Sequence, residues 1–142
     1  MAKLRSFDLR VVEQIAPDIL ILEIGTNDLV DTSPEIVGSE IESLVCLLVE
    51  QYKVRVVCVC HVIPRGHSYH EAASFPARVE VLQQYLDIAL SPFPNVFCWL
   101  HSVFSHPGKD LYLPDGVHVN PAGQYHLYRS YRGAILQALR LL

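Results

Sequence analysis

Apolar residues form two kinds of segment that follow one another along the chain, namely short continuous runs and longer stretches with helical spacing. Three short runs of mostly apolar residues occupy positions 18–24, 54–62 and 95–100, with little alternation between apolar and polar positions. Runs of this length that are rich in β-branched residues are typical of strands buried on both faces of a sheet. The pattern therefore predicts three strands, and the first is expected to be buried on both faces.

The segments around these runs carry apolar residues at helical spacing. A helix is predicted over residues 3–16, ahead of the first strand, and each strand is followed by another helical pattern. Ser33 followed by Pro34, and Asn120 followed by Pro121, are typical of a capping residue and a first helical position. The helix between these two is predicted to open at Pro76.

The predicted order is a helix followed by three strand–helix units. Strands that alternate with helices favour a parallel sheet with helices on both faces. We predict a single domain over residues 1–142 with a three-layer α/β/α, flavodoxin-like architecture. Ligands of such sheets bind beyond the carboxyl ends of the strands, so residues 25–28, 64–70 and 101–118 are expected on one rim.

Composition and charge exclude several classes of protein. Hydrophobic residues make up 51% of the chain, which agrees with strands buried on both faces. No apolar run approaches the roughly 20 residues that span a bilayer, and the first residues lack the apolar core of a signal peptide. We expect a cytoplasmic protein that binds no membrane. The net charge of −4 also argues against nucleic acid as a partner.

No metal or cofactor is predicted. Apolar segments contain all the cysteines, which we expect to be buried thiols in a reducing compartment. The histidines that could be considered as metal ligands lie on loops without carboxylates or thiolates at ligand spacing. No strand is followed by a nucleotide-binding glycine pattern. The residues considered are Cys46, Cys58, Cys60, Cys98, His61, His67, His70, His101 and His106.

Two polar motifs follow the predicted strands. Gly25-Thr26-Asn27-Asp28 comes directly after the first strand, where Asn and Asp are common turn formers. The alternative is that the Asn27 amide donates a hydrogen bond to a developing oxyanion.

Asp115 and His118 stand three residues apart on a predicted loop that contains Gly116. They form either a simple turn or a pair in which the carboxylate orients the imidazole as a base. The position of the pair on the predicted rim favours the second interpretation.

These motifs resemble those of a known family. Residues 24–28 match the Gly-x-Asn-Asp block of the SGNH (GDSL-type) hydrolases, and residues 115–123 resemble their Asp-x-x-His block. Residues 75–79 resemble the segment before the intervening helix. The resemblance implies a serine ester hydrolase that acts on a small ester. It implies His118 as the general base, Asp115 as its orienting residue, Asn27 as the oxyanion donor, and Gly25 and Asp28 as loop supports.

The resemblance has one gap. The family carries its nucleophilic serine in a Gly-Asp-Ser block after an earlier strand, and only the predicted helix precedes residues 18–24 here. We therefore expect a shortened domain that lacks the first strand and the nucleophile. Ser68, within Gly66-His67-Ser68, and Ser102, after the third strand, are weak candidates and are expected to be ordinary loop hydroxyls.

Two functions remain open. The first is an esterase domain, inactive or impaired as this chain because the nucleophilic serine is absent, and active only if another segment supplies that serine. The second is a pseudoenzyme that serves as a binding or assembly module, or is a remnant. In both cases the strand at 18–24 would leave one edge unpaired, and such an edge favours self-association.

Overall fold

The computed structural model describes residues 1, 4–70, 74–106 and 109–142, with residues 6 and 7 described by their backbone alone. Its sheet has three parallel strands in the order β1-β2-β3. They are β1 (Ile19–Leu22), β2 (Val56–Cys60) and β3 (Val96–Trp99). Ile19 pairs with Val56, and Val57 pairs with Val96. The predicted parallel sheet is confirmed.

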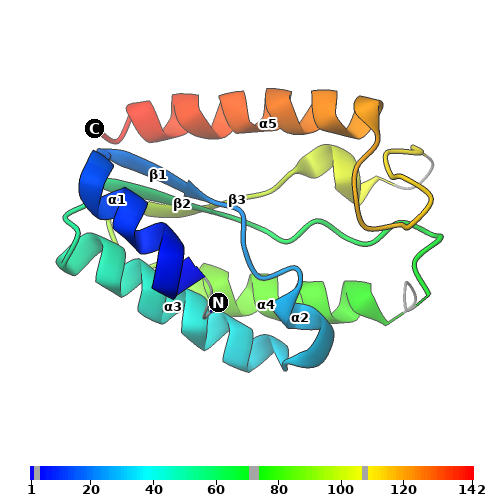
Figure 1. The fold of residues 1–142 in the computed structure, drawn as a ribbon, viewed down its shortest axis with the longest axis horizontal. Coiled ribbons are helices and arrows are strands. Elements are labelled where there is room, and N and C mark those ends of the chain that lie inside the picture. The colour runs from blue at the N-terminus through cyan, green and yellow to red at the C-terminus, as the bar shows by residue number, and fades with distance from the viewer. Residues whose placement is uncertain (2–3, 71–73, 107–108) are drawn as a thin grey trace.

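Helices cover both faces of this sheet, as Figure 1 shows. One face carries α5 (Pro121–Leu139). The other carries α3 (Pro34–Glu50) and α4 (Phe75–Ala89), with α1 (Leu9–Ile15) beside them. The main core lies between the sheet and α3 and α4, and a smaller cluster of Cys58, Cys60 and Ala134 lies under α5. The three-layer α/β/α architecture is therefore confirmed.

The predicted helix caps are present. The Ser33 Oγ atom accepts a hydrogen bond from the Ile36 N–H at 3.4 Å, and Asn120 Oδ1 accepts one from the Gly123 N–H at 2.9 Å. Each cap satisfies an N–H group that the first helical turn leaves without a partner. The Asn120 cap matters for the site, because it fixes the start of α5 at Pro121, three residues after His118.

The strands are shorter than predicted, and only β2 is buried throughout. Residues of β3 and most of β1 are only partly buried. The prediction that the first strand is buried on both faces is thus wrong, because β1, like β3, is only partly buried. The reason is their position, because both lie at the outside of a three-stranded sheet. The pairing of β1 with β2 ends at Leu22, and the side chain of the next residue, Glu23, is hydrogen-bonded to His101 and Tyr131.

Within the described residues, two short helices were not predicted, and the first predicted helix has two parts. The first predicted helix consists of a π-helical turn, η1 (Leu4–Asp8), followed by α1. Lys3, its expected first residue, lies outside the described part of the chain. A one-turn helix, α2 (Asp28–Asp31), follows β1, and a 3₁₀ helix, η2 (Ser102–Ser105), follows β3. Within the described ranges, no helix has both the length and the apolar character needed to cross a membrane.

Candidate active site

The loops that follow the three strands lie at one end of the sheet, as predicted (Figure 1). Residues 25–28 follow β1 and are called the Asn27 arm below. Residues 111–120 precede α5 and are called the His118 arm. Residues 64–69, after β2, form a third loop, which contacts both arms.

Asp115 and His118 form the pair that their spacing predicts. The Nδ1 atom of His118 lies 2.5 Å from Asp115 Oδ2. The second carboxylate oxygen, Oδ1, accepts hydrogen bonds from the N–H groups of Val117 at 2.9 Å and His118 at 3.0 Å. The hydrogen bond with His118, aided by the two backbone N–H groups, lowers the pKa of Asp115 to about 2. An ionised carboxylate at Nδ1 keeps a proton there and leaves Nε2 available for proton transfer.

A short hairpin holds this pair in place. The Leu113 N–H donates to the His118 oxygen at 2.7 Å, and the Asn120 N–H donates to the Leu111 oxygen at 2.9 Å. Gly116 stands at the tip with a φ of +67°, in the left-handed region that favours glycine. Because Asn120 also caps α5, the long helix anchors the base of the His118 arm.

The Asn27 arm begins with a tight turn. Gly25 has a φ of +95°, and its oxygen accepts the Leu29 N–H at 2.9 Å. The Asn27 side chain is exposed, and its amide makes no hydrogen bond to any described residue. Asp28 Oδ1 accepts a hydrogen bond from the Met1 ammonium at 2.7 Å. The Asn27 amide is therefore free to donate to a ligand, while Asp28 is engaged within the fold.

The loop at residues 64–69 joins the two arms. Arg65 donates from Nη2 to the Thr26 oxygen at 3.1 Å. The next residue, Gly66, donates its N–H to the Gly116 oxygen at 2.8 Å. The sequence gives no local sign of this role, because Thr26 and Gly116 are both distant from the loop along the chain.

The two weak nucleophile candidates have different surroundings. Ser68 packs against the His118 arm, where a Cβ atom built on Gly116 would lie 3.0 Å from the Ser68 Oγ. Ser102 opens η2, after β3. Both residues are exposed. Neither hydroxyl is hydrogen-bonded to His118 in the described structure, and His118 Nε2 has no partner among the described residues.

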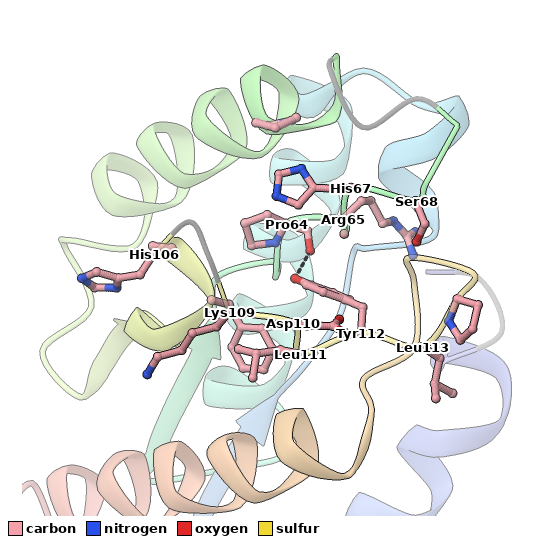
Figure 2. Close-up of a pocket in the computed structure, with 15 residues that line it drawn as sticks. Pro64, Arg65, His67, Ser68, His106, Lys109, Asp110, Leu111, Tyr112 and Leu113 are labelled. Atoms are coloured by element: carbon pink, nitrogen blue, oxygen red, sulfur yellow. Dashed lines mark hydrogen bonds between the residues drawn. The ribbon is translucent and has the colours of Figure 1, made fainter.

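A cavity of about 850 Å³ adjoins the Ser68 side of the His118 arm. Figure 2 shows it between the loop after β2 and residues 104–106 and 109–114, with the Tyr112 hydroxyl donating to the Pro64 oxygen. Phe104, Leu111 and Leu113 contribute apolar surface. Neither Asn27 nor His118 is among its lining residues. The cavity therefore lies beside the proposed reacting groups and does not enclose them.

A polar network centred on the buried His101 lies under the rim on the α5 side. The ring of His101, only 2% exposed, has Nε2 at 2.8 Å from Glu23 Oε2 and Nδ1 at 2.8 Å from Ser130 Oγ. The Tyr131 hydroxyl also donates to Glu23, at 3.1 Å. Burial alone lowers the pKa of His101, but hydrogen bonds with Cys60 and Glu23 and the Glu23 charge outweigh it and raise the pKa to about 9. This network was not predicted.

Among the residues that the structure describes, two side-chain groups have the composition of a metal site. Glu23, Cys60 and His101 form one, and His61, Asp87 and Cys98 form the other. In the first, both His101 nitrogens already have oxygen partners, and the raised pKa favours an imidazolium, which cannot coordinate a metal. In the second, burial and the Asp87 carboxylate raise the pKa of the Cys98 thiol to about 12, which opposes formation of a thiolate ligand.

Comparison with known proteins gives the family. The model of the GDSL-like lipases and acylhydrolases matches residues 1–129, and the chain belongs to this family. A solved structure provisionally described as a platelet activating factor from Streptococcus pneumonia has the same fold, with a TM-score of 0.69 and 21% sequence identity. The match covers 82% of this chain and 59% of that one, so this chain corresponds to only part of its relative. No curated protein sequence matches.

Proposed function

We propose that this chain carries the acid–base and oxyanion groups of a carboxylester hydrolase that acts on small esters. The observation that carries the proposal is the contact between His118 Nδ1 and Asp115 Oδ2 at 2.5 Å. The hydrogen bonds of Asp115 lower its pKa to about 2, so its carboxylate stays ionised in acidic solution as well as at neutral pH. Membership of the GDSL-like family supports the same chemistry.

The reaction follows from these positions. His118 Nε2 takes the proton from an attacking hydroxyl group or water as its oxygen bonds to the ester carbon. Asp115 stabilises the resulting imidazolium, and the Asn27 amide donates to the oxygen that gains negative charge. As the tetrahedral intermediate collapses, His118 returns the proton to the departing alcohol.

We also propose that the chain alone hydrolyses esters slowly. Neither Ser68 nor Ser102 is hydrogen-bonded to His118 in the described structure, as an activated serine would be. Loss of a triad serine costs on the order of 10⁶ in kcat. Water activated by His118 would then supply a weak residual rate. A non-catalytic binding or assembly module is the alternative.

Location and partners are also proposals. All four cysteines are free thiols, which fits a reducing compartment such as the cytoplasm. An ester of small size is the proposed ligand, and the unpaired edge of β1 is the proposed site of self-association.

A fluorophosphonate probe tests the nucleophile. We expect no serine to be labelled in the wild-type chain, in Ser68→Ala or in Ser102→Ala, as read by mass spectrometry of the digested protein. Labelling that disappears only in Ser68→Ala would identify that residue as an activated nucleophile and would contradict the proposed impairment.

A further inference from the structure

The loop at residues 64–69 is the one described segment with hydrogen bonds to both arms of the candidate site. It follows β2, the central and fully buried strand of the sheet. A loop that starts from the central, most buried strand is well placed to set the positions of its neighbours.

Arg65 provides the contact with the Asn27 arm. Its Nη2 donates to the oxygen of Thr26, the residue directly before Asn27. The Cζ atom of its guanidinium lies 5.0 Å from the ring centre of Tyr69 and 4.9 Å from that of Phe75. A planar guanidinium in contact with two aromatic rings has little rotational freedom. The direction of the hydrogen bond to Thr26 is therefore fixed.

Two glycines provide the contact with the His118 arm. The Gly66 N–H donates to the Gly116 oxygen at 2.8 Å. A Cβ atom on Gly66 would approach the Tyr112 ring to 2.9 Å, and one on Gly116 would approach the Tyr69 nitrogen to 2.5 Å. Side chains at either glycine would push the two segments apart. Their absence lets the loop and the His118 arm pack backbone to backbone.

We propose that Arg65 is a positioning residue that sets the spacing between Asn27 and His118. Its side chain binds the Asn27 arm, and the N–H of the next residue, Gly66, binds the His118 arm. The same loop therefore holds both arms. The proposal rests on the proposed function in one respect, namely that both arms act on one ester carbonyl. A displacement of about 1 Å between reacting groups can cost on the order of 10²-fold in rate.

Arg78 offers a matched control for Arg65. Its Nη2 also donates to a backbone oxygen, that of Thr32 at 2.6 Å, and Thr32 belongs to neither arm. The Nε atoms of both arginines are buried without a hydrogen-bond partner. Loss of either arginine removes a buried Nε atom and a hydrogen bond to a backbone oxygen, and of the two only Arg65 contacts an arm of the candidate site.

The experiment compares Arg65→Met with Arg78→Met by NMR. It follows the Asn27 side-chain amide, the His118 imidazole and the hydrogen-exchange rate of the Gly66 N–H. In Arg65→Met we expect both side-chain signals to shift and the exchange of Gly66 to become several-fold faster. In Arg78→Met all three should stay at their wild-type values.

Equal changes in the two variants, or no change in Arg65→Met, would overturn the proposal. If Arg65→Met does not fold, Arg65→Lys is compared with Arg78→Lys in the same way. Lysine keeps the positive charge but lacks the planar guanidinium, so it should not restore the fixed direction of the hydrogen bond to Thr26.

Ester turnover separates this proposal from the proposed function. Where turnover is measurable, Arg65→Lys should lower kcat by roughly tenfold or more and leave KM nearly unchanged, because it alters alignment more than binding. NMR signals that respond only to Arg65, in a chain without turnover, would overturn the proposed function alone. Turnover that depends on His118 but not on Arg65 would overturn the role of Arg65 alone.

Discussion

The Nδ1 atom of His118 lies 2.5 Å from a carboxylate oxygen of Asp115, although the two side chains are 73% and 47% exposed. The other oxygen of Asp115 binds two backbone N–H groups of the same turn. An exposed ion pair that is held only by its side chains contributes little to the free energy of folding. Here the backbone fixes the carboxylate, so the imidazole is oriented without burial.

Replacement of Asn27 by alanine tests the oxyanion role. The amide makes no hydrogen bond within the described chain, so its loss should leave the free energy of unfolding unchanged. Loss of an oxyanion donor typically lowers kcat by about 10²–10³-fold. We expect kcat for an aryl acetate to fall toward the uncatalysed rate with little change in KM. Asn95→Ala, at the opposite end of the sheet, is the control and should behave as wild type.

Alanine substitutions at Gly25 and Gly116 should lower the free energy of unfolding by different amounts. At Gly25 the new Cβ would be no nearer than 3.4 Å to its neighbours, so the cost comes from the φ of +95°. Left-handed backbone costs an ordinary residue about 1–2 kcal/mol. At Gly116 the Cβ would also lie 2.5 Å from the Tyr69 nitrogen, so we expect a larger loss. Urea unfolding measures both, and equal losses would contradict this account.

The Glu23–His101 pair should make stability fall in alkaline solution. The folded state raises the pKa of His101 from 6.5 to about 9. The stabilisation is therefore complete below pH 6.5 and is lost as the pH rises through about 9. We expect the urea midpoint of the wild type to fall over this range. Glu23→Gln should flatten the fall, whereas Glu13→Gln, at an exposed site, should not.

The unpaired edge of β1 should drive self-association. Among the described residues β1 pairs only with β2, and Ile19 belongs to neither core cluster. We expect sedimentation velocity to show association that increases with protein concentration. Lysine on an edge strand opposes pairing, so Ile19→Lys should shift the chain toward monomer. A wild-type chain that stays monomeric at all concentrations would rule out this contact.

Local sequence patterns were sufficient for the sheet, the helix caps at Ser33 and Asn120, and the Asp115–His118 pair. The caps and the pair depend on residues within a few positions of one another, and the parallel order of the strands follows from their alternation with helices. The partial burial of β1 could not be predicted, because it depends on which strands lie beside it. The contact of Arg65 with Thr26 and that of His101 with Glu23 join residues far apart in sequence. No periodicity or motif encodes such contacts, and only the folded chain reveals them.

Hydrolysis of a short-chain aryl acetate is the most direct test of the central claim, that His118 and Asp115 act as the acid–base pair. The account predicts slow turnover by the wild-type chain, a loss to the buffer rate in His118→Ala, and a strong decrease in Asp115→Asn. His126→Ala, on α5, should keep the wild-type rate. No turnover by the folded wild-type chain, or an unchanged rate in His118→Ala, would contradict it.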